Sequence, residues 1–377
     1  MIAPQPTAPS VEGPSSTGPA APLLDVRDLT VVYGRDGDER ASVAVREVSF
    51  ALRRGEVLGL VGESGCGKTT TGLALLRLLR PPGRVVAGQA LLDETDILAL
   101  PERAMERWRG NRLSLIFQNP MTSLNPTYTI GAQIAETIRA HRDVSKRAAL
   151  DRAAELLSLV GMPAPRDRLR SYPHELSGGQ RQRAVIALAI ALEPDVVIAD
   201  EPTTALDLTI QAQILWLLGD LKDRLGMGML YITHDLHVAT GFCDRIAVIY
   251  AGEIIELAPA ADILARPSHP YTRGLVAALP ETSWRERMVA SIKGQPPVLG
   301  RALTSCPFAP RCPEVLPLCT QGHPALRQHD ATHAVRCVRR EGGPSATAAL
   351  TPPAPPDALV MERIDAVEEE SDAAGRG

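Results

Sequence analysis

The 377-residue sequence predicts an α/β fold built around a buried parallel sheet. The apolar runs 57–61, 196–199 and 229–232 are typical of strands covered on both faces, and each is followed by polar residues. A helical pattern begins at about Lys68, soon after the first run, and stops at Pro81. Because parallel strands share one carboxyl edge, we expect their polar extensions to lie together there.

The segment between the first strand and its helix has the composition of a phosphate-binding loop. Its glycines allow backbone N–H groups to surround phosphate oxygens, and the helix N-terminus adds a favourable dipole. In such loops the lysine reaches the terminal phosphates and the next hydroxyl ligates Mg²⁺, the roles predicted for Lys68 and Thr69. A chance glycine-rich turn is the alternative, but the flanking strand and helix favour ATP binding by a P-loop NTPase (RecA-like) core. The predicted ATP-binding residues here are Gly62, Glu63, Ser64, Gly65, Cys66, Gly67, Lys68, Thr69 and Thr70.

Two acidic residues, Asp200 and Glu201, end the strand predicted at 196–199. This position predicts that Asp200 holds Mg²⁺ and that Glu201 acts on the attacking water. A helix N-cap is the alternative for such a pair, but the neighbouring phosphate loop favours the catalytic interpretation.

A second anion-binding surface is predicted at Ser177, Gly178, Gly179 and Gln180, just before a helical pattern. One ATP cannot use both surfaces within one chain. With Leu176, these residues resemble the signature segment of ABC transporter ATP-binding subunits. In that family two subunits pair head to tail, and the signature of one covers ATP held by the other. The resemblance therefore implies a second ATPase subunit, either the same chain or a related one.

Further positions of this sequence match that family one at a time. Tyr33 resembles the family's aromatic residue that stacks on adenine. Gln118 resembles the family's glutamine that contacts Mg²⁺ and the attacking water. Asp207 matches a loop that crosses the dimer interface, and His234 the histidine that contacts the γ-phosphate. Cys66 stands where the family often has a small residue, so we interpret it as a loop element rather than a reactive thiol. Catalysis is thus assigned to Glu201, His234 and Gln118.

The domain organisation follows from the extent of the resemblance and from composition. Strands at 23–33 and 43–61 are expected to supply an antiparallel β subdomain. The Pro- and Ala-rich ends have too few core-forming residues to offset chain entropy. The predicted division is a disordered tail at 1–22, an ATPase domain at 23–260 with a helical subdomain at about 101–192, an extension at 261–340 and a disordered tail at 341–377.

The C-terminal part narrows the resemblance to one branch of the family. Segments 266–273, 200–207 and 119–126 are similar to the ATPases of oligopeptide and dipeptide permeases. Importers of nickel share these features. The ATPase does not contact the cargo, so its sequence leaves peptides, nickel and other small solutes open.

Four of the six cysteines gather in the C-terminal extension, as Cys306, Cys312, Cys319 and Cys337. Their spacing lacks the paired C-x₂-C motifs that are usual in structural zinc sites, and four thiolates also suit an iron–sulfur cluster. Spacing alone therefore leaves three possibilities open: a zinc site, an iron–sulfur cluster or free thiols. The permease resemblance implies a [4Fe-4S] cluster, which is our expectation. Three histidines, His323, His329 and His333, are expected to be exposed rather than to replace a thiolate.

Composition restricts the partners and the compartment. A net charge of −4 is small for this length, so nucleic acid is not an expected partner. There is no apolar run of membrane-spanning length and no secretory signal, which places the chain in the cytosol. With the resemblance, we expect a peripheral ATPase on the cytoplasmic face of the cell membrane.

The resulting functional hypothesis is an ATP-hydrolysing subunit that energises an ABC importer of di- and oligopeptides. The implied partners are two transmembrane permease subunits, the second ATPase subunit and an extracytoplasmic peptide-binding protein. The alternative from another class is a soluble ABC ATPase in DNA repair or translation. It is disfavoured because the chain has neither a second phosphate loop nor a long coiled-coil insertion.

Overall fold

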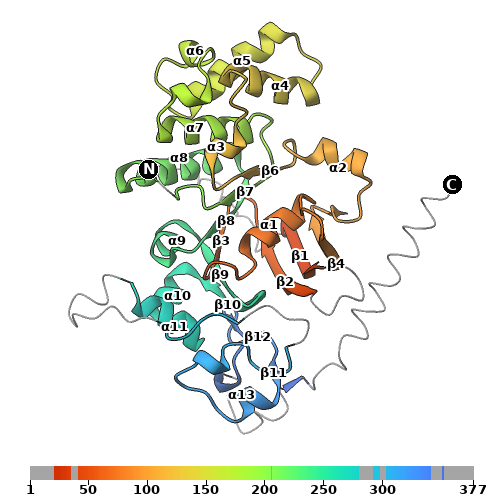
Figure 1. The fold of residues 1–377 in the computed structure, drawn as a ribbon, viewed down its shortest axis with the longest axis vertical. Helices are drawn as coiled ribbons and strands as arrows, with labels where there is room; N and C mark the ends of the chain where they lie inside the picture. The colour runs from red at the N-terminus through yellow and green to blue at the C-terminus, as the bar shows by residue number, and fades with distance from the viewer. Residues whose placement is uncertain are drawn as a thin grey trace, which may run out of the picture.

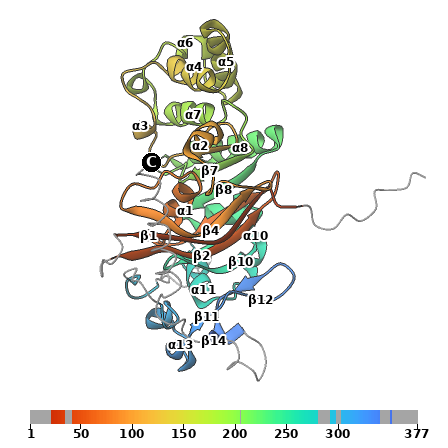
Figure 2. The ribbon, with the colours of Figure 1, turned by 90° about the vertical axis from the view of Figure 1, so that its right-hand side faces the viewer.

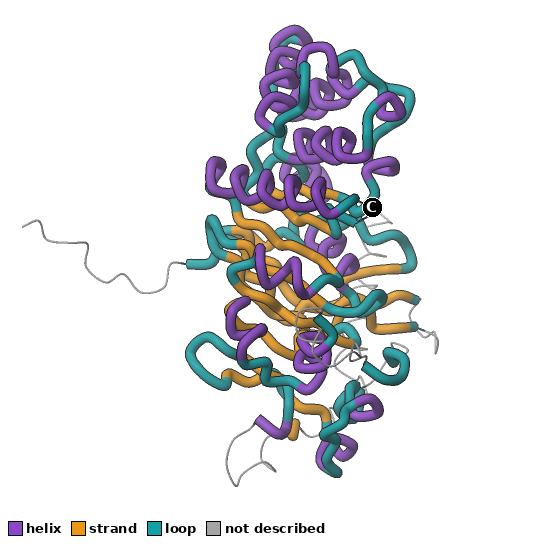
Figure 3. The backbone as a smooth tube through the Cα atoms, turned by 90° about the vertical axis from the view of Figure 1, so that its left-hand side faces the viewer, coloured by secondary structure: helices purple, strands orange, loops and turns teal. Residues whose placement is uncertain are grey.

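A large sheet runs through the middle of the molecule, with helices packed around it (Figure 3). The computed structural model describes residues 21–34, 41–204, 206–279, 292–297, 303–340 and 350–351. In this part of the chain the large sheet has the strand order β12-β13-β10-β9-β3-β8-β7-β6. Its strands are β3 (Val57–Val61), β6 (Leu113–Ile116), β7 (Val196–Asp200), β8 (Gly228–Thr233), β9 (Arg245–Tyr250), β10 (Glu253–Pro259), β12 (Arg327–Gln328) and β13 (Ala334–Val335).

The parallel part of this sheet is buried on both faces. Strands β9, β3, β8, β7 and β6 pair in parallel, whereas β10, β13 and β12 extend one edge in antiparallel pairing. Alternate residues enter different cores: Val57 and Val197 belong to one hydrophobic cluster, and Leu58 and Val196 to the other. Because both faces need apolar side chains, these strands read as continuous apolar runs.

A smaller antiparallel sheet lies beside helix α1 (Lys68–Leu75), as Figure 2 shows. Its strand order is β2-β1-β4-β5, with β1 (Leu24–Tyr33), β2 (Ser42–Leu52), β4 (Gly83–Leu92) and β5 (Thr95–Asp96). The run 43–61, predicted as strand throughout, is two strands in two different sheets. The break comes at Gly55, whose φ of 70° is left-handed and favours glycine.

Helices α4, α5 and α6 form a lobe at the top of Figure 1, far from the C-terminal elements at the bottom. The predicted helical stretch 101–192 contains this lobe but also β6, the edge strand of the large sheet. The short run Leu-Ser-Leu-Ile carries too little periodicity to separate it from the helical pattern around it. The helices of this stretch are α2 (Glu102–Trp108), α3 (Pro120–Ser123), α4 (Ile130–His141), α5 (Lys146–Leu159), α6 (Pro165–Arg168) and α7 (Gly178–Ala189).

The remaining helices follow β7 along the chain. They are α8 (Leu208–Leu225), α9 (Leu236–Phe242), α10 (Ala260–Ala265), α11 (Pro270–Ala277) and α13 (Leu318–Gln321). Among the described residues, no helix has the length and apolar character needed to cross a bilayer. A short pair of strands, β11 (His323–Pro324) and β14 (Leu350–Thr351), completes the C-terminal part. The predicted tails 1–22 and 341–377 fall outside the described residues, except at 21–22 and 350–351.

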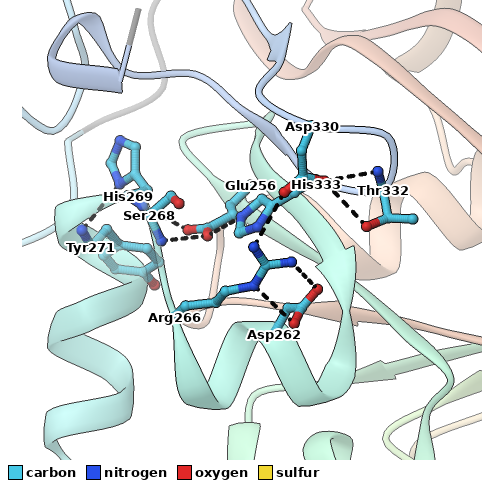
Figure 4. Close-up of polar contacts among 9 residues, drawn as sticks. All are labelled: Glu256, Asp262, Arg266, Ser268, His269, Tyr271, Asp330, Thr332 and His333. Atoms are coloured by element: carbon cyan, nitrogen blue, oxygen red, sulfur yellow. Dashed lines mark hydrogen bonds and ion pairs between the residues drawn. The ribbon is translucent and has the colours of Figure 1, made fainter. Parts of the chain in front are cut away.

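The C-terminal segment is attached to the large sheet through a buried carboxylate, that of Glu256 on β10 (Figure 4). One oxygen accepts the Ser268 N–H at 2.6 Å, the other accepts the His269 N–H at 2.8 Å, and His333 Nε2 lies 2.7 Å from the first. Glu256 and His333 are 0% and 1% exposed. The loop before α11 and the loop before β13 are therefore joined at one point.

Burial opposes ionisation of Glu256, but hydrogen bonds from His333, Thr272 and the N–H groups of Ser268 and His269 lower its pKa. Because the carboxyl group is more acidic in the folded protein than in the unfolded chain, it stabilises the fold above its ordinary pKa of 4.5. This stabilisation is lost as the pH falls below that value.

We expect Glu256→Gln to lower the free energy of unfolding by about 3 kcal/mol at neutral pH, because the buried partners lose a charged acceptor. Urea denaturation followed by circular dichroism measures this change. Asp330→Asn is the control, since Asp330 lies in the same network at the surface and should change stability by less than about 1 kcal/mol. Equal stability of Glu256→Gln and the parent would contradict the prediction.

Candidate ATP-binding and hydrolysis site

Residues 62–67 of the predicted glycine-rich segment form the loop between β3 and α1, and residues 68–70 begin α1. Gly67 is the N-cap of α1 with φ of 105°, a conformation that favours glycine. Lys68 is buried, and its Nζ donates to the carbonyl oxygens of Gly62 at 2.8 Å and Glu63 at 2.9 Å. Ser64 and Gly65 are exposed at the tip. The loop thus has an open face and a cation held at its base.

Cys66 belongs to this loop, and its side chain is buried. Its side chain is 6% exposed, and its Sγ lies 3.8 Å from Lys68 Nζ. Burial raises the pKa of the Cys66 thiol, and the Lys68 charge offsets only part of the effect. The thiol therefore stays protonated near neutral pH, which fits a loop element rather than a nucleophile.

A hydroxyl and a carboxylate meet where α1 begins and β7 ends. Thr69 Oγ1 donates to Asp200 Oδ1 at 3.1 Å. Asp200 is 6% exposed. Burial and the neighbouring Glu201 charge raise the pKa of Asp200, although the Thr69 hydrogen bond and the Lys68 charge lower it in part. A cation placed beside this carboxylate would offset the burial of its charge.

The Glu201 carboxylate contacts the other two predicted catalytic residues, Gln118 and His234. Its Oε2 accepts Gln118 Nε2 at 2.8 Å and Thr204 Oγ1 at 2.9 Å, and its Oε1 lies 2.9 Å from His234 Nδ1. Glu201 has a positive φ of 45°, and its N–H donates to the Ile232 carbonyl of the neighbouring strand β8. Such a conformation is uncommon outside glycine and is concentrated at functional sites. Thr204 was missed as a site residue, although its hydroxyl stands three positions after the acidic pair.

The Glu201 carboxylate is ionised at neutral pH. Burial opposes the charge, but hydrogen bonds from His234 and Thr204 and the charges of His234 and Lys68 lower the pKa of Glu201. An ionised carboxylate that is held in place by hydrogen bonds can orient a water and accept its proton. The geometry therefore places an ionised carboxylate close enough to Lys68 of the phosphate loop for the two charges to interact.

The predicted signature residues lie at the start of α7, where Ser177 and Gly178 are exposed. Ser177 is the N-cap of α7: its Oγ accepts the Gln180 N–H at 3.3 Å, and its N–H donates to Gln180 Oε1 at 3.1 Å. Ser177 and Gly178 are exposed, and Asp207, the exposed N-cap of α8, accepts the Ile210 N–H at 3.0 Å. In Figure 1, α7 lies toward the upper lobe, whereas α1 lies beside the antiparallel sheet.

Tyr33 is the last residue of β1, half-buried beside Gly83. Its pairing partners are Ser42 and Gly83 at the ends of β2 and β4. The structure describes no hydrogen bond from Tyr33 to the phosphate loop, so adenine stacking stays a prediction.

The expected [4Fe-4S] cluster is a wrong prediction. Within the described residues, which include all four C-terminal cysteines, no group of three or more His, Cys, Asp or Glu side chains could hold a metal ion. Burial raises the pKa values of the Cys306, Cys312 and Cys337 thiols, that of Cys306 to about 12, and so keeps them protonated. Cluster ligation requires thiolates. All four cysteines are free thiols. Cys306 and Cys319 pack with Ala309 and Val338 in a small hydrophobic cluster, and Cys312 packs against the larger core cluster.

Two of the histidines expected at the surface are instead paired with buried glutamates. His333 is 1% exposed and contacts Glu256, and His323 Nε2 lies 2.9 Å from Glu253 Oε2. Sequence reasoning missed them because both glutamates lie on β10, about 70 residues earlier in the chain.

Family models match two parts of the chain. The model described as ABC transporter matches residues 45–204, which contain the phosphate loop, the signature and the acidic pair. The model described as the C-terminal region of oligopeptide/dipeptide transporters matches residues 255–319.

Whole-chain relatives and solved structures agree with these matches. A probable peptide ABC transporter ATP-binding protein of Sinorhizobium fredii is 48% identical over 319 residues, 84% of this chain and 95% of that protein. An oligopeptide transport ATP-binding protein of Salmonella typhimurium is 45% identical over 307 residues, 81% and 90% of the two chains. A solved dimer of the ATP-binding cassette MJ0796, bound to ADP and phosphate, has a TM-score of 0.57 and 26% identity, covering 63% of this chain and 99% of that one. With the ATP-site geometry above, these similarities show that the chain belongs to the ABC transporter family, as an ATP-binding subunit.

Proposed function

We propose that this chain is the ATP-hydrolysing subunit of an ABC importer of di- and oligopeptides. Two observations carry the proposal. Lys68, Thr69, Asp200 and Glu201 converge at one edge of the sheet. Residues 255–319 of the same chain match the oligopeptide/dipeptide transporter C-terminal region. The relatives in Sinorhizobium and Salmonella carry peptide-transport names. We divide the chain into an ATPase part at 23–260, which includes the helical lobe, and an extension at 261–340.

ATP would be held by the loop 62–70, with its terminal phosphates near Lys68. The oxygen donor set of Thr69 and Asp200, 3.1 Å apart, fits Mg²⁺, and Gln118 beside Glu201 offers a further amide oxygen. When bound, Mg²⁺ neutralises charge on the terminal phosphates. Glu201 then orients the attacking water and takes its proton, while His234 and Gln118 hold the Glu201 carboxylate. Tyr33 is assigned to the adenine.

A second ATPase subunit completes the site in this proposal. Ser177, Gly178, Gly179 and Gln180 form the N-terminus of α7, where Ser177 and Gly178 are exposed and the helix dipole favours an anion. Placed over the ATP of a partner, they would cover its phosphates, and Asp207 would lie at the same interface. The MJ0796 cassette, which shares the fold, was solved as a dimer.

Two transmembrane permease subunits are the proposed membrane partners, with the chain bound peripherally at the cytoplasmic face. A groove in the helical lobe is the proposed docking site. It is lined by Tyr128, Ala132, Arg139, Ala140, Leu150 and Arg170 among others. Buried and half-buried apolar residues form its floor, and its rim carries charges of both signs, the basic Arg139, Lys146, Arg166 and Arg170 and the acidic Glu136, Asp151 and Asp167. Such a groove suits an amphipathic helix with charged flanks. An extracytoplasmic peptide-binding protein would deliver the cargo.

We expect Ala140→Arg to abolish co-purification with the permease subunits while changing the ATPase rate of the isolated chain by less than about twofold. Ala140 is exposed in the groove and far along the chain from the phosphate loop, so a large side chain there blocks docking and leaves the fold intact. Ala148→Arg, on the exposed start of α5 outside the groove lining, is the control. Full assembly of Ala140→Arg would contradict this docking site.

The whole proposal is tested by purifying the intact complex and identifying the bound solute. Peptide-stimulated ATP hydrolysis by an assembly with two membrane subunits supports it. Bound nickel would favour the metal importer. A free dimer stimulated by nucleic acid, without membrane partners, would refute the import function.

A further inference from the structure

The C-terminal region contacts the phosphate loop directly at Glu63. Arg311 Nη1 donates to Glu63 Oε2 at 2.9 Å, and Arg311 Nη2 donates to Glu63 Oε1 at 3.0 Å. The Glu63 N–H donates to Tyr271 Oη at 3.1 Å. Two segments more than 200 residues away in the chain therefore hold one loop residue, by its side chain and by its main chain. We call Glu63, Tyr271 and Arg311 the Glu63 clasp.

Arg311 is buried and is held by contacts on several sides. Its side chain is 6% exposed, and Nε donates to the Lys293 carbonyl at 3.0 Å. Nη1 also lies 3.3 Å from Tyr250 Oη, and the guanidinium lies 5.7 Å from the centre of the Tyr250 ring. A planar guanidinium that is held on several sides pairs with a carboxylate at little further loss of entropy.

Tyr271 is fixed by the attachment point shown in Figure 4. It is 0% exposed, and its N–H donates to His269 Nδ1 at 3.0 Å. Burial lowers the pKa of His269 to about 4, so its ring is neutral and can accept this hydrogen bond. Glu256 in turn accepts the His269 N–H. The Tyr271 ring packs against Tyr250, with centroids 4.7 Å apart, so both arms of the clasp rest on one aromatic cluster.

We propose that Arg311 and Tyr271 are positioning residues for ATP: through Glu63 they hold the phosphate loop in the shape that receives the triphosphate. The Glu63 carbonyl accepts Lys68 Nζ at 2.9 Å, so Arg311 and Tyr271 are separated from the phosphate-binding lysine only by Glu63. Arg311 also compensates the Glu63 charge, which would otherwise repel the phosphates. This proposal rests on the ATP-hydrolysing function proposed above.

Arg311→Met in the full-length protein is expected to raise the KM for ATP, and the Kd for a fluorescent ATP analogue, by about tenfold. The kcat should stay within about threefold, because Glu201 and its partners do not touch the clasp. Arg311→Lys should restore part of the affinity, since one ammonium can still compensate Glu63. Tyr271→Phe removes a single acceptor and should raise the KM by about threefold.

A double-mutant cycle separates the clasp from general effects of the substitutions. Glu63→Gln should weaken ATP binding, and the double variant Glu63→Gln/Arg311→Met should be no weaker than Arg311→Met within about twofold. Fully additive effects would mean that the two residues act independently and would overturn the proposal.

Arg339→Met is the matched control. Arg339 lies in the same region and pairs with Glu314, away from the loop, so this variant should keep the parent KM. Parent-like ATP affinity of Arg311→Met refutes the clasp alone, whereas a parent protein that binds no ATP refutes the proposed function and the clasp with it. If Arg311→Met fails to fold, Arg311→Lys and Tyr271→Phe provide the same comparison. The clasp would then be refuted if both variants keep the KM of the parent protein for ATP.

Discussion

Replacing Glu201 with glutamine is expected to lower the rate of ATP hydrolysis by about 10²- to 10⁴-fold while ATP binding persists. Glutamine keeps the size of the side chain and can still contact Gln118 and Thr204, but it cannot accept a proton from water. Phosphate release and binding of a fluorescent ATP analogue measure the two effects separately. We also expect the variant to accumulate as an ATP-bound dimer, because dissociation would await hydrolysis.

Glu193→Gln is the control for this variant. Glu193 precedes β7 in the sequence, whereas Glu201 follows it. Glu193 pairs with Arg152 at the surface, and the structure describes no contact between it and the site residues. It should hydrolyse ATP at the parent rate. Parent-like turnover by Glu201→Gln would show that another group activates the water.

Replacing Lys68 with alanine is expected to have the second large effect, a loss of about 10²- to 10³-fold in turnover together with weaker ATP binding. Lys68 is the buried cation at the base of the loop, and its Nζ donates to the loop carbonyls of Gly62 and Glu63. Alanine removes both the charge and the hydrogen-bond donors. Titration with the fluorescent ATP analogue and the rate of phosphate release measure the change.

Lys222→Ala serves as its control, since Lys222 is paired with Asp223 on α8 and contacts no site residue. Full-speed hydrolysis by Lys68→Ala would overturn the assignment of the loop. If ATP binding never brings two chains together, the proposed dimer would be wrong instead.

The arrangement of the predicted ATP site could be anticipated because its elements are local. A phosphate loop needs consecutive N–H groups, and residues 62–70 place such a run after the end of a strand and into the start of a helix. The acidic pair was equally clear, since a parallel strand delivers its last residues to the same edge. Ser177 caps α7 through hydrogen bonds to Gln180, only three residues later.

Predictions failed where distant segments decide the environment of a side chain. The spacing of Cys306, Cys312, Cys319 and Cys337 allowed a metal site, but within the described residues the fold forms no metal-binding group from them, and Cys306 and Cys319 pack into an apolar cluster. The run 43–61 looked like one strand because apolar content alone does not reveal that β2 and β3 join different sheets.

The sequence by itself determined the nucleotide chemistry, because each phosphate-binding element is made of residues close together in the chain whose local conformation aims their own N–H groups and oxygens. Only the tertiary structure brought Gln118 and His234 onto the Glu201 carboxylate and placed Arg311 and Tyr271 on Glu63. The physical reason is that hydrogen bonds between residues 33 to 248 positions apart depend on how strands and loops pack, which local propensity does not determine.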